Sequence, residues 1–146
     1  MRSLIQLSLD SQVKVRARRP EDCLAKIIAK LSQNARVVGQ LEREGVKTSA
    51  YLMELRSLAG QVVSQIDECV KAGHRPSALA ATAVYTAEQL LVKRDRRERR
   101  ITQRDVADCG ETAEYTVREQ YREIFAPALT SSAAGCSVLP LARLAR

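Results

Sequence analysis

Apolar residues recur along this chain mainly at intervals of three and four, the spacing that places side chains on one face of a helix. Pro20 suits the first position of a helix, and the following residues predict a helix over 21–32 with one apolar face made by Leu24, Ile27, Ile28 and Leu31. A shorter helix is predicted over 35–44, closed by Gly45 as a left-handed cap. The pattern therefore favours an all-α fold.

Two longer helices are predicted in the middle of the chain. The most sustained helical spacing runs over 51–72 and ends ahead of Gly73. Pro76 then opens a helix that is apolar on nearly all sides as far as Leu91. Because such a helix must be surrounded by others, we expect it to be the buried centre of the domain.

A dense charged run, 93–100, follows the central helix with six basic and two acidic residues. Charges at this density are rarely buried, so we expect a solvated turn that could add nonspecific affinity for phosphates.

Beyond this run, a short helix, a turn and a longer helix are predicted. Thr102 is a good N-cap, with Asp105 completing a capping box, for a helix that ends near Asp108. Residues 109–111 form the turn and Thr112 can cap again, after which Ala113, Val117, Tyr121 and Ile124 form an apolar stripe that ends at Pro127. This arrangement predicts a helix-turn-helix over about 102–126.

Composition and charge fit one helical domain with an acidic partner. Aromatic residues make up only 3% of the 146 residues, which suits packed helices better than sheets. We expect a lead-in or linker over 1–19, one domain over 20–127, and a flexible tail over 128–146. The net charge of +7 favours nucleic acid as the partner.

This sequence lacks the residue patterns that several functional classes require. The cysteines are too far apart for a zinc or thioredoxin-type site, and we expect four buried, reduced thiols: Cys23, Cys69, Cys109 and Cys136. His74, the only histidine, has no second ligand at helical spacing and is expected to be a cap or surface residue. No catalytic motif or cofactor site is present, and no apolar run is long enough for a membrane helix. We therefore expect a non-enzymatic intracellular protein without a cofactor.

Three segments in order resemble one known family: Arg75–Tyr85, Ile101–Ala107 and Thr116–Glu123. They are similar to the carboxy-terminal cyclin-like repeat of transcription factor IIB from archaea and eukaryotes, and the resemblance covers roughly residues 19–126. It implies a five-helix cyclin-like domain whose helix-turn-helix contacts promoter DNA next to the TATA box. The implied partners are duplex promoter DNA, the TATA-binding protein and RNA polymerase, with the protein a monomer. The implied location is the nucleoid in the cytoplasm of an archaeon or the nucleus of a eukaryote.

The resemblance and the helical spacing together give six candidate DNA-binding residues. In the family, the recognition helix reaches base edges from the position of Arg118 and from a smaller apolar residue where this chain has Tyr115. Arg122 shares their helix face at i+7, and Thr116 is adjacent. Gln103 and Arg104, at the start of the preceding helix, are placed to contact phosphate.

Three alternatives remain open at the level of sequence. Arg118 and Arg122 are also spaced to form surface ion pairs with Glu114 and Glu119, which would leave them structural. The acidic residues around them favour a protein-interaction module, or a decoy regulator that binds the TATA-binding protein or RNA polymerase without reading DNA. A free-standing helix-turn-helix repressor ranks last because no dimerisation helix is evident.

Overall fold

The computed structural model describes residues 19–129, and this part of the chain is helical without strands. Its elements in order are α2 (Pro20–Leu31), α3 (Ala35–Arg43), α4 (Thr48–Ser64), α5 (Glu68–Ala72), α6 (Pro76–Asp95), α7 (Gln103–Cys109), α8 (Glu114–Gln120) and the π-helix η1 (Tyr121–Phe125). The predicted all-α class is confirmed. Residues 1–18 of the predicted lead-in, and the tail from residue 130 onward, lie outside the described residues.

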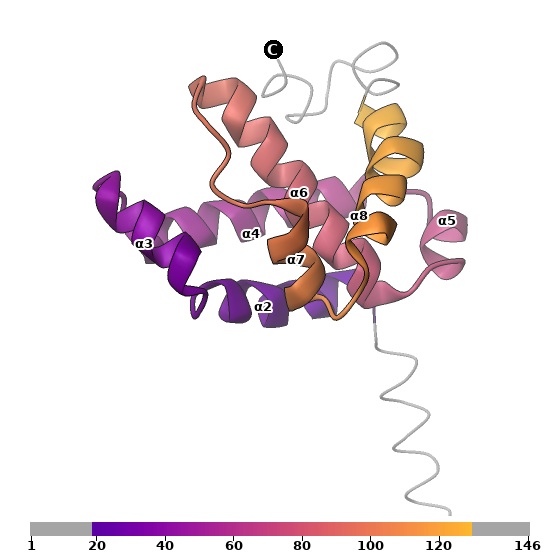
Figure 1. The fold of residues 1–146 in the computed structure, drawn as a ribbon. Coiled ribbons are helices and arrows are strands. Elements are labelled where there is room, and N and C mark those ends of the chain that lie inside the picture. The colour runs from indigo at the N-terminus through magenta and orange to yellow at the C-terminus, as the bar shows by residue number, and fades with distance from the viewer. Residues whose placement is uncertain (1–18, 130–146) are drawn as a thin grey trace, which may run out of the picture.

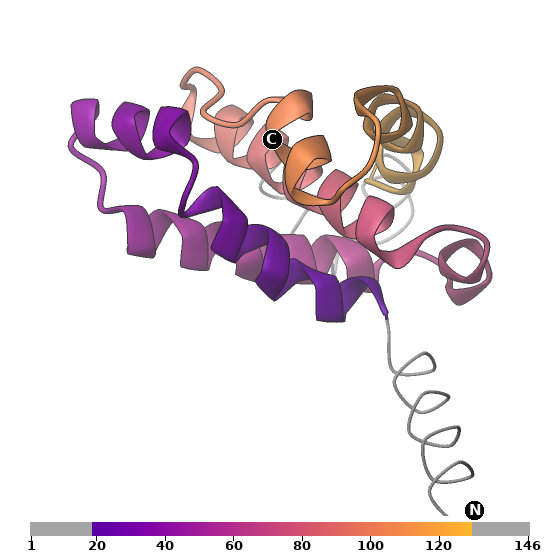
Figure 2. The same ribbon diagram turned by 60° about the horizontal axis from the view of Figure 1, so that its bottom comes forward.

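Helix α6 is the centre of the domain, as its composition predicts. It contacts α2, α4, α7, α8 and η1, and both views show the other helices arranged around it (Figures 1 and 2). Small residues such as Ala80, Ala83 and Ala87 are fully buried along it, which lets the neighbouring backbones approach closely. Pro76 occupies the first turn, where its missing N–H costs no hydrogen bond.

Helices α2 and α4 complete the core against α6, while α3 and α5 lie at opposite ends of the domain (Figure 1). The predicted apolar face of α2 is correct, with Leu24, Ile27 and Leu31 buried. The predicted short helix α3 is also present. It ends in a Schellman motif, in which Gly45 adopts φ 71° and the Val46 N–H donates to the Leu41 carbonyl.

The long helix predicted over 51–72 is wrong, because the chain breaks into α4 and α5. The α4 helix ends at Ser64, and Asp67 then caps α5 by accepting a hydrogen bond from the Cys69 N–H at 2.8 Å. An Asp followed by an acidic residue is a helix start signal, but it was masked by apolar spacing that continues across the break. With α3 and α5 counted, the described residues hold seven α-helices rather than the expected five.

The turn between α7 and α8 is tight and depends on two adjacent residues. The predicted Thr102–Asp105 capping box starts α7. At the other end a Schellman motif places Glu111, not a glycine, in the left-handed conformation at φ 54°. Gly110 is needed instead because the turn lies close to α6: a Cβ at this position would be 2.8 Å from the Cβ of Ala81. Thr112 was expected to cap α8, but its backbone is held in this turn and Ala113 is the N-cap.

The predicted single helix over 113–126 is not regular throughout. After Gln120 it becomes the π-helix η1, in which the Ala126 N–H donates to the Tyr121 carbonyl. This wider turn brings Phe125 into the core, where it is 1% exposed. The helix was expected to end at Pro127, but residues 126–129 are helical, and Ala128 and Leu129 pack against the core. The proline is tolerated where the hydrogen-bond ladder is already irregular.

No helix within residues 19–129 has both the length and the apolar character needed to cross a membrane.

Candidate nucleic-acid interface

Gln103 and Arg118, two of the six predicted residues, come together beside Tyr85 of α6. The Gln103 side-chain amide lies 3.4 Å from the Tyr85 hydroxyl, and the Arg118 Nε lies 3.5 Å from Gln103 Oε1. Both contacts are long for hydrogen bonds and therefore weak. They link α6, α7 and α8 at one point and leave the Arg118 side chain exposed.

Tyr85 is itself held firmly at this point. Its side chain is buried, and its ring meets the ring of Tyr121 edge-to-face at a centroid distance of 5.3 Å. Burial raises the pKa of the Tyr121 hydroxyl, so this hydroxyl stays protonated. Gln103 and Arg118 thus lie beside a rigid aromatic support.

The other four candidates differ in their surroundings. Arg104 is exposed, and no acidic group of residues 19–129 pairs with it. Tyr115 is 64% exposed in the first turn of α8, and the neighbouring Thr116 is half-buried. Arg122 lies in η1, so it does not continue the regular α-helical face of Tyr115 and Arg118.

The two arginines of the last helix also differ in their partners. Arg122 donates to Glu119 at 2.6 Å and lies 3.9 Å from Glu123, as the ion-pair alternative predicts. The other predicted pair, Glu114 with Arg118, does not form within the described part of the chain. Arg118 therefore keeps its charge available to a partner, whereas Arg122 is already engaged.

A buried carboxylate on α6, Glu88, organises the region before α7, and sequence reasoning missed it. Glu88 is 0% exposed and receives two hydrogen bonds from the Arg97 guanidinium at 2.8 and 2.9 Å, one from the Arg100 N–H at 2.7 Å, and one from the Tyr51 hydroxyl at 2.7 Å. Burial and this carboxylate raise the pKa of Tyr51, so its hydroxyl stays protonated and donates. The available signal was an acidic residue within the apolar stretch 78–91 of this helix.

The prediction that the charged run 93–100 is a solvated turn is consequently wrong for two of its six cations, Arg97 and Arg100. The side chains of Arg97 and Arg100 are only 13% and 11% exposed. Both guanidinium groups lie over the Tyr51 ring, with their central carbons 5.7 and 5.1 Å from the ring centroid. Arg94 pairs with Glu54 at 3.0 Å. Dense charge could be buried here because each buried cation has a carboxylate or a ring as its partner.

Helix α3 is connected to the start of α7 by a single arginine. Arg36 donates to the Asp105 carboxylate and, at 3.2 Å, to the Arg100 carbonyl. Asp105 is the same carboxylate that completes the α7 capping box. Through Arg36, the segment 33–50 therefore helps to fix the helix that presents Gln103.

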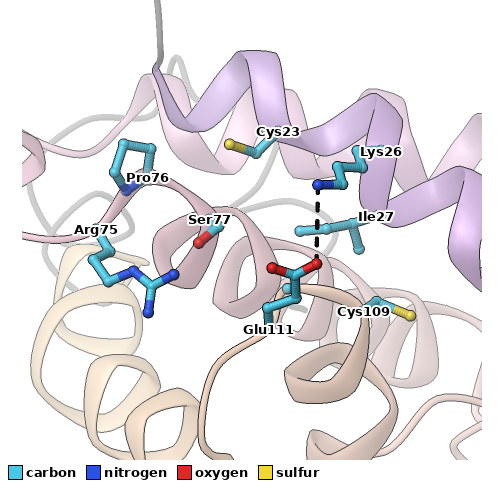
Figure 3. A pocket seen from close by; sticks show the side chains of 9 residues that line it. Cys23, Lys26, Ile27, Arg75, Pro76, Ser77, Cys109 and Glu111 are labelled. Carbon is cyan, nitrogen blue, oxygen red and sulfur yellow. Dashed lines mark ion pairs between the residues drawn. The ribbon is translucent and has the colours of Figure 1, made fainter. Parts of the chain in front are cut away.

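A cavity of about 110 Å³ lies between α2, the start of α6 and the α7–α8 turn (Figure 3). Lys26 and Glu111 face each other across it at 4.0 Å, and Lys30 pairs with the same glutamate at 3.1 Å. Cys23 and Cys109 also line it. Lys26 and Glu111 are thus already paired, and the cavity is separate from the Gln103–Arg118 contact.

The expectation of four buried thiols is correct only for Cys109. Cys23 is half-buried and Cys69 is exposed, while Cys136 lies outside the described residues. Burial raises the pKa of the Cys109 thiol. His74 lies at the surface with its Nδ1 2.9 Å from the Val70 carbonyl, at the end of α5, as expected of a cap.

Comparison with known families finds no family model that matches this chain. No solved structure matches it either.

Proposed function

We propose that this chain is a DNA-binding module of transcription initiation that acts as the second repeat of transcription factor IIB does. In this proposal, α7 and α8 are a helix-turn-helix within a cyclin-like domain, and the protein contacts promoter DNA next to the TATA box together with the TATA-binding protein. The observation that carries the proposal is the state of Arg118. Its guanidinium is exposed, contacts Gln103 of the other helix, and lacks a carboxylate partner among the described residues.

The chemistry of this pair suits duplex DNA. An arginine that enters the major groove can bond O6 and N7 of guanine with two parallel hydrogen bonds. A residue with the reach of Gln103 or Arg104 at the start of the preceding helix can bond the phosphate backbone, which fixes register without reading sequence. One helix would then supply specificity and the other orientation.

A second function, a protein-interaction module or decoy that does not read DNA, is favoured by a different observation. Tyr115 is 64% exposed, a large apolar side chain at the position where the resembled family has a smaller one. Glu114 and Glu123 are also exposed on this helix, and their charge repels phosphates. An exposed aromatic residue with an acidic rim is typical of a protein contact.

Binding of the full chain to two duplexes separates these functions. One duplex contains a TATA box with a purine-rich upstream flank, and the other has the same composition in scrambled order. Each is measured at two salt concentrations, with and without the TATA-binding protein. Salt-sensitive binding that prefers the first duplex supports the DNA-reading module. Association with the TATA-binding protein in the absence of any duplex binding would make the decoy the function instead.

A further inference from the structure

The basic run 93–100 contains cations that pair with a carboxylate and cations that do not. Arg94, Arg97 and Arg100 are each paired with a carboxylate. Arg96 and Arg99 are exposed, and no acidic group of residues 19–129 pairs with either. Only these two arginines of the run are therefore available to an anionic partner.

Arg99 differs from Arg96 because its position is fixed. Its guanidinium carbon lies 5.6 Å from the centre of the Tyr85 ring, whereas Arg96 has no ring contact and lies at the left-handed end of α6. The backbone on either side is anchored as well, since the Arg97 side chain and the Arg100 N–H both donate to the buried Glu88. A side chain held in this way loses little conformational entropy when it binds a ligand.

The ring that supports Arg99 is the one beside Gln103 and Arg118. Arg99 lies over the face of Tyr85, while Gln103 approaches its hydroxyl and contacts Arg118. Two exposed guanidinium groups, one from the loop and one from α8, are thus associated with a single buried tyrosine. Stacking on a ring face leaves the N–H edge of a guanidinium available for a planar acceptor such as phosphate.

We infer that Arg99 is a phosphate-contacting residue, held on Tyr85 so that it donates to the DNA backbone while Arg118 meets the bases. This inference rests on the proposed function, because it requires that the chain bind duplex DNA. It assigns separate roles to the two arginines. Arg99 contributes affinity that is equal on all sequences, and Arg118 contributes the preference among them.

The test compares Arg99→Ala with Arg96→Ala in the full chain. The two substitutions remove the same charge from the same loop, so only the fixed position of Arg99 distinguishes them. Dissociation constants are measured between 50 and 200 mM salt on the TATA-containing duplex and on its scrambled counterpart. Loss of one phosphate contact lowers the slope of log K against log salt by about 0.9, so a fourfold rise in salt should weaken the wild type about 3.5-fold more than Arg99→Ala. Arg96→Ala should change this ratio by less than half as much.

Each other outcome overturns the inference in a recognisable way. Equal effects of the two substitutions would mean that only the net charge of the loop matters. A loss confined to one duplex would make Arg99 a base-reading residue. In both of these cases the wild type still binds DNA and the proposed function stands. Absence of duplex binding by the wild-type chain would instead remove both proposals. Thermal unfolding of each variant confirms that the exposed substitutions leave the fold intact.

Discussion

Arg118 and Arg122 occupy neighbouring turns of the same helix, yet they should contribute differently to DNA binding. Arg122 is held by Glu119 at 2.6 Å, while Arg118 contacts only Gln103, at 3.5 Å, among the described residues. Arg118→Ala should reduce the preference for the TATA-containing duplex over the scrambled one by about 1–3 kcal/mol, the value of one bidentate base contact. Arg122→Ala removes a charge that is already paired with Glu119, and it should leave this preference unchanged.

Competition binding with the two duplexes measures that preference directly. Arg122→Ala is the matched control, because it removes the same charge four residues away. An equal loss on both duplexes from Arg118→Ala would show that this arginine contacts the backbone rather than the bases.

The close packing of the turn between α7 and α8 leads to a second prediction, on the stability of glycine variants. Gly110→Ala would place a Cβ 2.8 Å from Ala81 and 3.0 Å from the Ser77 carbonyl, so overpacking should lower the free energy of unfolding by about 1–3 kcal/mol. Gly60 in α4 has open space around its Cβ position. Gly60→Ala should therefore stabilise the protein by about 0.5–1 kcal/mol through helix propensity alone.

Urea unfolding of the two alanine variants decides whether close approach is the reason for the glycine in this turn. Similar midpoints for Gly110→Ala and Gly60→Ala would contradict the close packing of the turn against α6. Glu111→Gly offers a further check, since it relieves the left-handed residue at φ 54° and should raise stability by up to about 1 kcal/mol.

At the scale of elements, Glu88 holds the loop between α6 and α7 in place. Its carboxylate accepts hydrogen bonds from Arg97, from the Arg100 backbone and from Tyr51, all in a buried setting. Glu88→Gln removes the negative charge and leaves the largely buried Arg97 with only Asp95, a more exposed carboxylate 3.8 Å from its Nε. Breaking a buried pair in this way costs about 3–5 kcal/mol.

Glu98→Gln is the matched control for this prediction, because it makes the same change at an exposed position of the same loop. It should change the unfolding free energy by less than about 0.5 kcal/mol. Hydrogen exchange of loop amides should also become faster in Glu88→Gln only. If the two variants have equal unfolding free energies, Glu88 does not anchor the loop.

The elements that were predictable from sequence are those set by local signals. The helix at Pro20, the Gly45 cap, the Thr102 capping box and the largely apolar α6 each depend on residues within a few positions of one another. The errors arose where distant residues decide the structure. Arg97 and Arg100 could be buried only because Glu88 and Tyr51 lie beside them, and Arg36 meets Asp105 across 69 positions.

The candidate site was likewise predictable only where residues close together in the sequence determine it. Helical spacing placed Arg118 at the surface, but it could not reveal that Gln103 would come to lie against it from another helix. It also assumed a regular helix through Arg122, and the π-helix alters that face. The role of Arg99 depends on the Tyr85 ring, fourteen positions earlier in the chain, and no spacing rule connects them.

At the scale of the whole molecule, most of the net positive charge lies outside the described domain. Six basic residues and one acidic residue fall in 1–18 and 130–146, so residues 19–129 carry only +2 of the total +7. The described domain alone therefore has little general attraction for a polyanion. Any long-range attraction of the chain for DNA must come largely from its two ends.

Because of this distribution, removal of the two ends should lower the affinity for DNA but leave the preference between sequences unchanged. A fragment of residues 19–129 keeps Gln103, Arg118 and Arg99, and it should retain the ratio of affinities for the two duplexes, because phosphate contacts by the ends carry no sequence information. Its slope of log K against log salt should be shallower than that of the full chain by up to about 4.5, if the ends meet phosphates with all of their excess charge. A fragment that folds, as judged by circular dichroism, but has lost the ratio would place specificity in the ends rather than in α7 and α8.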